Sequence, residues 1–489
     1  MKWSIGNKYR RIEDVSHEAM CALESKVSQC PWRQTFHVQP ITGLLNDPNG
    51  FSYFNGEYHL FYQWHPLEPV HGLKYWYHTK STDLVNWENA GIGIEPNAYF
   101  DSHGAYSGSA IEHNDELYLF YTGNTRDELF VRHPYQCMAV MSPSGHIEKL
   151  SRPVIDRVPN GYTDHFRDPK VWKEGNTFYA VIGAQRTNKT GCVVLYRSTD
   201  LINWTFEGEI KTQLDPFGYM WECPDYFTLQ EYGVLIFSPQ GLEAEGDQHQ
   251  NIYQSGYVIG DKLDLSHKRF NHGDFQELDR GFDFYAAQTM LNPEGRRIVI
   301  GWMGLPDMEY PTDKNGWAHC LTLPRELSIK KGKLIQKPVI ETHTLRQKEY
   351  HFQDAIFDEI KSYEGFSGDT YELISEFENG NASEFGIELR AGKEEKTVIK
   401  YNAITKKVIL DRSLSGKPVG LDYGTERSCA MNADQIKFHV FVDRSSVEIF
   451  VNDGEEVFTA RIFPDQTSQD IRFFVKNGSI NIKATMWDY

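Results

Sequence analysis

Short β-rich runs that return about every 60 residues constrain the fold of this chain more than any other feature. Each run follows a turn sequence and is rich in Tyr, Phe, Leu, Ile and Val, which favour strands. Equivalent positions in successive runs fall at Phe61, Phe120, Ile182, Phe237 and Ile300, so the spacing is nearly constant. Because each interval has room for four short strands, the pattern predicts five similar β-sheets in succession.

A second repeat supports the same unit length. The heptapeptide STDLVNW at residues 81–87 returns as STDLINW at residues 198–204, which is about two units later. Five units of four strands each predict an all-β fold, a five-bladed β-propeller. The alternative is a β-sandwich whose hairpins resemble one another by chance.

The chain divides into three parts by its pattern. A short helix is expected between Ser16 and Cys30, inside an N-terminal extension at residues 1–34. The propeller is expected at residues 35–340. From residue 345 to residue 489 apolar and polar residues alternate, which predicts a separate C-terminal β-sandwich without a cluster of candidate catalytic residues.

The charge of the chain excludes two classes of partner. Its 489 residues contain 68 Asp and Glu against 50 Lys and Arg, which gives a net charge of −18. Nucleic acids and anionic membranes bind clustered cations, so neither is an expected partner. No run approaches the ~18 consecutive apolar residues that a membrane-spanning helix needs.

The remaining composition favours a cytoplasmic protein. The first residues contain no apolar stretch typical of a secretory signal, and the seven cysteines are scattered without a CxxC pair. This cysteine usage is typical of a reducing compartment. Neither a metal-ligand spacing nor a nucleotide-binding glycine motif occurs, so no metal and no cofactor are expected. The sequence does not indicate the oligomeric state.

Three acidic residues occupy equivalent positions in different units. In a propeller the innermost strands line a central channel, so residues at one register position converge there. We count back the same number of residues, to within one position, from each of the five anchors. The residues found there are Asp47, Tyr106, Asp168, Glu222 and Tyr285. A single Asp-Pro sequence would be interpreted as a turn, but three carboxylic acids in register predict a functional site.

Paired carboxylic acids in an aromatic pocket are suited to glycoside hydrolysis. One carboxylate attacks the anomeric carbon or activates a water, while a protonated partner delivers a proton to the leaving oxygen. Aromatic walls suit the apolar faces of a sugar ring. A separation of ~5–5.5 Å between the carboxyl groups would retain the configuration and ~6.5–9.5 Å would invert it, so these residues alone leave both outcomes open.

Three short segments carry a resemblance to a known family. The sequences NDPNG at 46–50, FRDPK at 166–170 and ECP at 222–224 resemble the three acidic motifs of glycoside hydrolase family 32, the β-fructofuranosidases. The resemblance covers roughly residues 35 to 489. Further matches are FYQ at 61–63, YSGS at 106–109, DFYA at 283–286 and GWM at 301–303.

The resemblance implies a five-bladed propeller with a sandwich, and a retaining mechanism. It implies that Asp47 is the nucleophile, Glu222 the general acid/base and Asp168 the residue that binds fructose hydroxyls and stabilises the transition state. Arg167 would also favour the charged form of its neighbour Asp168. The substrate-binding positions that it implies are Asn46, Gln63, Tyr106, Ser107, Arg167 and Trp302.

One segment departs from the pattern of many invertases. Where those enzymes have a Trp-Gly pair, this chain has HGLKYWYH at residues 71–78, which resembles bacterial enzymes that act on sucrose 6-phosphate. His71 is therefore an expected substrate-binding residue, and a basic rim could bind a phosphate. Lys74, Arg126 and Arg132 are further candidates for that rim, with solvated surface residues as the alternative.

The expected partner is thus a small sugar, sucrose 6-phosphate or sucrose, hydrolysed to fructose and glucose 6-phosphate or glucose. Two other functions stay open at this point. The first is a fructan hydrolase or fructosyltransferase, and the second is a propeller that binds carbohydrate without catalysis.

Overall fold

The computed structural model describes residues 5–214 and 216–489, and most of its regular structure is β-strand. The first four residues of the expected N-terminal extension lie outside the described part. Two α-helices precede the strands: α1 (Ile5–Lys8) and α2 (His17–Ser28). Ser16 accepts a hydrogen bond from the backbone nitrogen of Ala19 and so caps α2. Short 3-10 helices span Ile12–Asp14, Pro311–Asn315, Ile340–Leu345 and Leu421–Tyr423.

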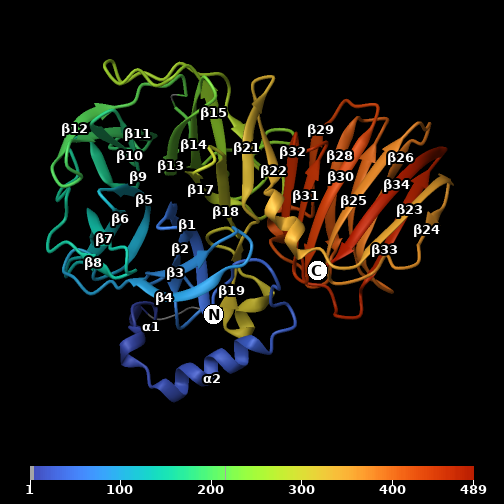
Figure 1. Ribbon diagram of the computed structural model, residues 1–489, viewed down its shortest axis with the longest axis horizontal. Coiled ribbons are helices and arrows are strands. Elements are labelled where there is room, and N and C mark those ends of the chain that lie inside the picture. Colours follow the sequence, from blue (N-terminus) through green and yellow to red (C-terminus); the bar gives the residue numbers. More distant parts are fainter. Residues whose placement is uncertain (1–4, 215) are drawn as a thin grey trace.

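Five sheets follow one another between residues 43 and 338, on the left and centre of Figure 1. In each sheet the first strand pairs with the second, and most later strands are added in chain order. The strands of the first two sheets are β1 (Gly43–Phe54), β2 (Glu57–His65), β3 (Tyr75–Ser81), β4 (Glu88–Ile94) and β19 (Trp317–Ala318), then β5 (Ala105–His113), β6 (Glu116–Arg126), β7 (Arg132–Met141) and β8 (Ile147–Lys149).

The other three sheets have the same organisation. Their strands are β9 (Tyr162–Glu174), β10 (Thr177–Arg186), β11 (Gly191–Ser198) and β12 (Trp204–Glu209); β13 (Met220–Leu229), β14 (Tyr232–Gln240), β15 (Gly256–Gly260) and β16 (Gln276–Glu277); and β17 (Tyr285–Leu291), β18 (Arg297–Met303), β20 (Cys320–Leu321), β21 (Arg325–Lys330) and β22 (Lys333–Pro338). The anchor residues of the sequence repeat all lie in second strands, β2, β6, β10, β14 and β18.

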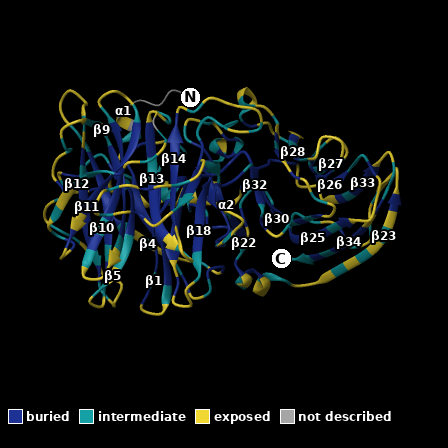
Figure 2. Cartoon of the chain, turned by 90° about the horizontal axis from the view of Figure 1, so that it is seen from above, coloured by how far each residue is buried: buried dark blue, intermediate teal, exposed yellow. Residues whose placement is uncertain are grey.

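The first strands of these sheets lie next to one another. β1 contacts β5, β5 contacts β9, β9 contacts β13, β13 contacts β17, and β17 contacts β1. The short strand β19 pairs in parallel with β1, so the chain returns to the first sheet after it has entered the fifth. Large aromatic and aliphatic side chains fill the spaces between the sheets, and the strands of this part are mostly buried in Figure 2.

Residues 349–488 form two six-stranded antiparallel sheets around one apolar core, on the right of Figure 1. The alternating residues Phe438, Val440 and Val442 are fully buried in that core. One sheet contains β23 (Glu349–Phe357), β34 (Ser479–Asp488), β25 (Thr370–Glu378), β30 (Ile436–Asp443), β31 (Ser446–Val451) and β32 (Glu456–Arg461). The other contains β24 (Ile360–Lys361), β33 (Asp470–Lys476), β26 (Glu384–Ala391), β27 (Lys396–Asn402), β28 (Lys407–Leu414) and β29 (Glu426–Ala430).

Buried charges join the C-terminal sheets to the N-terminal part. Arg325 of β21 bonds Glu448 of β31 at 2.5 Å and Asp279 at 3.0 Å, and all three side chains are at most 1% exposed. His37, which precedes β1, lies between Asp443 and Glu448. Removing one partner of such a buried set leaves an uncompensated charge, so the set fixes how the two parts dock.

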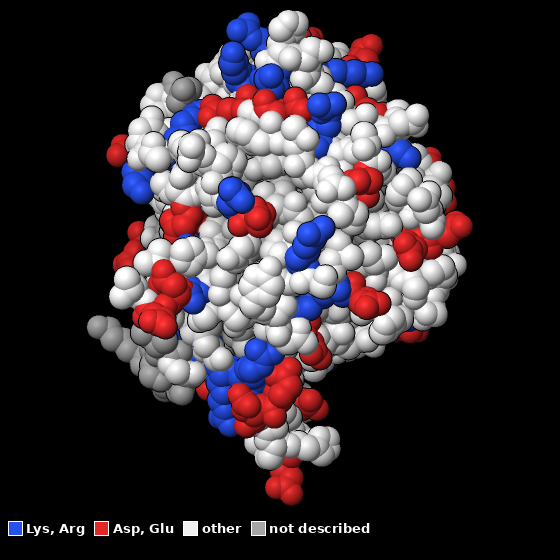
Figure 3. Space-filling model, turned by 90° about the vertical axis from the view of Figure 1, so that its left-hand side faces the viewer, with Lys and Arg blue, Asp and Glu red and all other residues white. Residues whose placement is uncertain are grey.

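The surface charges are mixed in sign. Figure 3 views the molecule from the left-hand side of Figure 1, and acidic and basic side chains alternate over that face. The net charge of −18 is therefore not gathered there into a single acidic patch. No helix in the described ranges, 5–214 and 216–489, is long and apolar enough to cross a membrane.

Candidate active site

Regular pairing between the first and second strand of all five sheets is interrupted at the position that the sequence register selects. Such an irregularity bends the strand and redirects its side chains, and it is common beside active sites. The interruptions fall between Leu45 and Pro48, Tyr106 and Gly108, Arg167 and Lys170, Glu222 and Asp225, and Tyr285 and Gln288.

The backbone is strained at three of these places. Asp168, Cys223 and Ala286 have φ angles of 67°, 47° and 51°. Residues with a side chain rarely adopt positive φ, because the Cβ atom then clashes with the backbone. Strain of this kind persists where the surrounding structure fixes it and is frequent at functional sites.

The interruptions surround a cavity of about 440 Å³. Its lining includes three carboxylic acids, Asp47, Asp168 and Glu222, and the two tyrosines of the register, Tyr106 and Tyr285. Nine of the ten predicted site residues line it, because Asn46, Gln63, His71, Arg167 and Trp302 do so as well.

The tenth predicted residue, Ser107, supports the cavity from behind. Its hydroxyl donates to Oδ2 of Asp47 at 2.5 Å, and Gln63 donates to the same oxygen at 3.0 Å. Oδ1 of Asp47 accepts only the weaker bond from Asn46, at 3.2 Å. Oδ1 is therefore the oxygen of Asp47 with fewer donors around it.

Burial raises the pKa of Asp47, and the charge of Glu222 adds to this effect. The hydrogen bonds from Ser107 and Asn46 and the positive charge of Lys74 oppose it. These donors keep the carboxylate usable as an anion in a site that is otherwise unfavourable to charge.

Glu222 is held by four donors. Arg167 donates to Oε1 from Nε at 3.0 Å and from Nη2 at 2.6 Å. The other oxygen, Oε2, accepts from Gln240 at 2.8 Å and from the hydroxyl of Tyr285 at 2.6 Å. Both oxygens are thus oriented by neighbouring side chains.

Asp168 and Asp47 meet at one residue, Cys223. Its sulfur lies 3.7 Å from Oδ2 of each carboxylate, and its backbone nitrogen donates to Asp168 at 2.9 Å. Burial raises the pKa of Asp168 to about 7, and the charges of Glu222 and Asp47 act in the same direction.

Arg167 lowers the pKa of Asp168, in the direction expected from the sequence, but burial outweighs it. The guanidinium group forms its ion pair with Glu222 and not with its chain neighbour. The sequence did not indicate Glu222 as the partner of Arg167, because the two residues belong to different sheets.

Lys74 points into the cavity wall and is only 2% exposed, so the surface position considered for it is wrong. Its Nζ has no hydrogen-bond partner among the described residues. Burial lowers the pKa of Lys74 to about 7, although the charge of Asp47 raises it. His71 lies at the exposed edge, with its ring 5.9 Å from that of Trp302.

Several cavity residues could not be found from the repeat. Lys8 and Tyr9 come from the N-terminal segment, and Phe130 comes from the turn between β6 and β7. Gln240 ends β14, and Tyr253 lies in the loop that follows. Gln240 follows Ser238 by two residues, and Ser238 pairs with Glu222 on the neighbouring strand. This closeness to Glu222 in the strand register is the signal that could have indicated Gln240.

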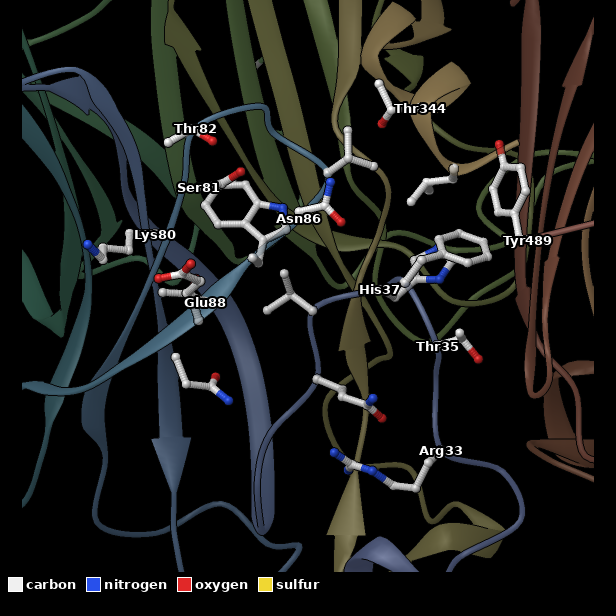
Figure 4. Close-up of a pocket in the computed structure, with 18 of the residues that line it drawn as sticks. Arg33, Thr35, His37, Lys80, Ser81, Thr82, Asn86, Glu88, Thr344 and Tyr489 are labelled. Atoms are coloured by element: carbon white, nitrogen blue, oxygen red, sulfur yellow. The ribbon is translucent and has the colours of Figure 1, made fainter. Parts of the chain in front are cut away.

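A larger cavity, of about 660 Å³, lies between residues 33–41, which precede β1, the strands β3 and β4, and the C-terminal residue (Figure 4). Figure 4 shows Lys80 and Glu88 on one side of it and Tyr489 on the other. Its Lys80 is paired with Glu57 at 2.9 Å. None of the three carboxylic acids of the register lines it, so the smaller cavity is the candidate active site.

The smaller cavity contains three carboxylic acids, which are side chains able to transfer protons and to act as nucleophiles. Within residues 5–214 and 216–489, no three His, Cys, Asp or Glu side chains are arranged to hold a metal ion. Five polar atoms of the lining residues are buried without a partner there: Oδ1 of Asn46, Nζ of Lys74, Nε1 of Trp302, and Nε of both Arg126 and Arg132. Each could bond a hydroxyl group of a sugar.

Comparison with known families and proteins gives a consistent result over the whole chain. Residues 37–338 match the glycosyl hydrolases family 32 N-terminal domain, and residues 341–488 match the family 32 C-terminal domain. The sucrose-6-phosphate hydrolase of Staphylococcus xylosus is 48% identical over 487 residues, which cover 100% of this chain and 98% of that protein.

Two solved structures are similar in fold and sequence. The sucrose-6-phosphate hydrolase from Lactobacillus gasseri superposes with a TM-score of 0.94 at 39% identity, over 100% of this chain and 99% of that one. A variant of the β-fructofuranosidase from Bombyx mori, in complex with sucrose, has a TM-score of 0.79 at 33% identity, over 97% of this chain and 98% of that one.

Proposed function

The chain belongs to glycosyl hydrolases family 32, and we propose that it is a retaining β-fructofuranosidase that hydrolyses sucrose 6-phosphate and sucrose. The observation that carries the assignment is the convergence of Asp47, Asp168 and Glu222 on one cavity. The relatives named sucrose-6-phosphate hydrolase support the substrate, since they match this chain from end to end.

In the first step, Asp47 attacks C2 of the fructosyl unit and forms a fructosyl-enzyme ester. Oδ1 is the attacking oxygen in this proposal, because Ser107 and Gln63 already bond Oδ2. The same two bonds fix the carboxylate, so it needs little reorganisation as it forms the bond to C2 and loses its negative charge.

Glu222 supplies the proton and later removes one. It protonates the glycosidic oxygen, so glucose 6-phosphate or glucose leaves as a neutral alcohol at that atom. In the second step the Glu222 carboxylate takes a proton from water, which attacks C2 and releases fructose. Arg167, Gln240 and Tyr285 position this carboxyl group for both steps.

Asp168 binds fructose hydroxyl groups in this proposal. The pKa of about 7 makes it the group whose proton is lost near neutral pH. The charges of Glu222 and Asp47 both raise the pKa of Asp168, so the protonation of Asp168 depends on these two neighbours. Asn46, Lys74 and Trp302 offer their unpartnered atoms to the remaining hydroxyl groups.

The proposal extends to the architecture. We infer that the five sheets are the blades of a closed five-bladed propeller, since the contacts between first strands run from β1 round to β17 and back. The division into an extension at 1–34, a catalytic propeller at 35–340 and a sandwich at 345–489 follows from this arrangement. The cavity then lies on the axis of the propeller.

The Asp47→Ala substitution tests the nucleophile. The turnover of both substrates should fall by roughly 10⁴-fold or more, because the covalent route is lost while the fold is kept. An unchanged melting temperature would show that folding is intact. Turnover of sucrose and of sucrose 6-phosphate at the wild-type rate would refute the assignment.

A comparison of the two substrates tests the phosphate. We expect kcat/KM for sucrose 6-phosphate to exceed that for sucrose, and a ratio near one would remove the phosphate from the proposal. Product analysis at high sucrose concentration separates hydrolysis from fructosyl transfer, because transfer would yield oligosaccharides in place of free fructose.

A further inference from the structure

Two arginines face each other at the end of the β6–β7 hairpin. Arg126 is the last residue of β6 and Arg132 the first of β7, and the two form the terminal pair of that ladder. Like charges directly opposite each other on neighbouring strands destabilise a sheet. An anion that lies between the two cations would offset this repulsion and accept charge-assisted hydrogen bonds from both.

Within the described residues, neither arginine has a carboxylate partner. The Nε atoms of both are buried and have no hydrogen-bond acceptor. Arg126 bonds the backbone oxygen of Phe130 at 3.0 Å and lies over the Phe130 ring, 4.6 Å from its centre. These contacts orient its guanidinium group without neutralising it.

The nearest acidic residue in the hairpin is already engaged. One oxygen of Asp127 accepts from the backbone nitrogens of Leu129 and Val131, both at 2.9 Å. The other oxygen bonds His133 at 2.9 Å. Asp127 therefore shapes the turn and does not pair with either arginine. Asp164 acts on Arg132 from a distance, without an ion pair.

Both arginines line the same cavity as Asp47, but farther along the strands. Thr122 pairs with Tyr106 of the catalytic register, and Arg126 follows Thr122 at the end of β6. At about 3.3 Å per residue, the backbone of Arg126 lies ~13 Å beyond that register position. In the proposed function the fructosyl unit lies beside Asp47, so a group at this distance from the register could reach the sugar that leaves.

Other cations of the cavity are less suited to bind an anion there. Arg167 is paired with Glu222, and Lys74 lies beside Asp47. Lys8 also lines the cavity, and the ring of its neighbour Tyr9 lies 5.8 Å from that of Phe130 in the hairpin. His71 was the expected contact, but its ring packs edge-on against Trp302.

We propose that Arg126 and Arg132 together bind the phosphate of a glucosyl 6-phosphate group, so that this hairpin selects the phosphorylated substrate. The inference rests on the proposed function and deepens it. Guanidinium groups match phosphate oxygens with two parallel hydrogen bonds, and two of them match a dianion. They also offset locally the net charge of −18, which opposes the approach of a phosphate ester.

The test compares Arg126→Gln, Arg132→Gln and the double variant on sucrose 6-phosphate and on sucrose. Each substitution should lower kcat/KM for sucrose 6-phosphate by roughly 10- to 100-fold more than for sucrose, since a hydrogen bond to a charged group is lost. Arg126→Lys and Arg132→Lys should recover part of the loss. Turnover of sucrose reports in the same assay that each variant is folded.

Arg157→Gln is the matched control. Arg157 is an exposed arginine outside the cavity, and it contacts Asp156 at 3.1 Å, so its loss should change neither substrate. Glucose 6-phosphate provides a second readout: it should inhibit sucrose hydrolysis competitively in the wild type and much less in the double variant.

The outcomes separate the two proposals. If the wild-type enzyme does not prefer sucrose 6-phosphate, the phosphate in the proposed function is wrong. If it does prefer this substrate, and the double variant keeps the preference and the inhibition by glucose 6-phosphate, the arginine pair is not the phosphate site. The inference is supported if the wild type prefers sucrose 6-phosphate and the double variant loses this preference while it still turns over sucrose.

Discussion

Arg167 donates two hydrogen bonds to a single oxygen of Glu222, from Nε at 3.0 Å and from Nη2 at 2.6 Å. The second oxygen of Glu222 is fixed separately by Gln240 and Tyr285. The orientation of this carboxyl group is therefore set before a substrate enters. A preorganised group of this kind needs little reorganisation during the reaction.

The first prediction concerns this ion pair. Arg167→Lys keeps a positive charge beside Glu222 but cannot donate from two fixed nitrogens. We expect kcat for sucrose to fall by roughly 100-fold, because a small displacement of a catalytic group has an effect of this size. Steady-state kinetics measures the change, and kcat should fall more than KM rises.

Arg186→Lys is the control for that substitution. Arg186 bonds Glu209 through Nε at 3.0 Å and Nη2 at 2.6 Å, the same distances, but it lies outside the cavity. It should leave kcat unchanged. If both lysine variants reduced kcat equally, the effect would be general and Arg167 would have no role in positioning Glu222.

The second prediction concerns the proton donor. Glu222→Ala should lower the turnover of sucrose by roughly 10²- to 10⁴-fold, the usual contribution of general acid–base catalysis. With an activated aryl fructofuranoside, whose leaving group needs no proton, the first step should survive. Added azide should then accelerate turnover and yield a β-fructosyl azide, because it needs no general base.

Asp47→Ala serves as the comparison for the azide experiment. It lacks the nucleophile, so no fructosyl-enzyme ester forms and azide cannot give the product of retained configuration. An equal response of both variants to azide would contradict the division of roles between Asp47 and Glu222.

The three carboxylic acids could be located from the sequence because the strands repeat. Residues at the same distance from the anchor of each repeat lie at equivalent positions around the cavity. Asp47 and Glu222 are far apart in the chain, yet each precedes its own anchor, Phe61 or Phe237, by nearly the same distance. The short motifs around them then suggested their family. Both signals depend on residues that belong to the repeated strands.

The parts of the site that sequence reasoning missed are not marked by the repeat. Lys8 and Tyr9 reach the cavity from a segment before the first sheet, and no periodicity predicts where such a segment docks. The unpaired state of Arg126 and Arg132 depends on which acids surround them in space. The ion pair between Arg167 and Glu222 could not be predicted either, because Glu222 comes from the next sheet.

The third prediction uses the pH dependence of activity. The positive charge of Lys74 lowers the pKa of Asp47 against the effect of burial. Asp47 must be ionised to attack, so activity is lost as the pH falls through its pKa. Lys74→Met removes the cation, raises the pKa of Asp47 further, and should move the acid limb of the kcat/KM profile to higher pH.

Lys80→Met is the control for Lys74→Met. Lys80 is a paired residue at the other cavity, and its loss should leave the acid limb in place. The profile should be measured with sucrose, so that no ionisation of a substrate phosphate contributes. An unshifted acid limb in Lys74→Met would show that Lys74 has no influence on the nucleophile.

The last prediction concerns the junction between the two parts of the molecule. His37 bonds Asp443 through Nδ1 at 2.8 Å and Glu448 through Nε2 at 2.9 Å, and its side chain is 1% exposed. Burial alone would lower the pKa of His37, but the two carboxylates outweigh it and raise the pKa to about 9. The folded protein therefore holds a proton on His37 that the unfolded chain releases near pH 6.5.

The sign of the effect follows from that difference. A raised pKa stabilises the folded state fully below pH 6.5, and the contribution, about 3 kcal/mol, is lost as the pH rises through 9. His37→Gln should lower the melting temperature at pH 6.5, and the gap to the wild type should narrow by pH 10. His351→Gln, at an exposed position, should follow the wild type throughout. A constant gap for His37→Gln across this range would show that the His37 proton does not hold the junction together.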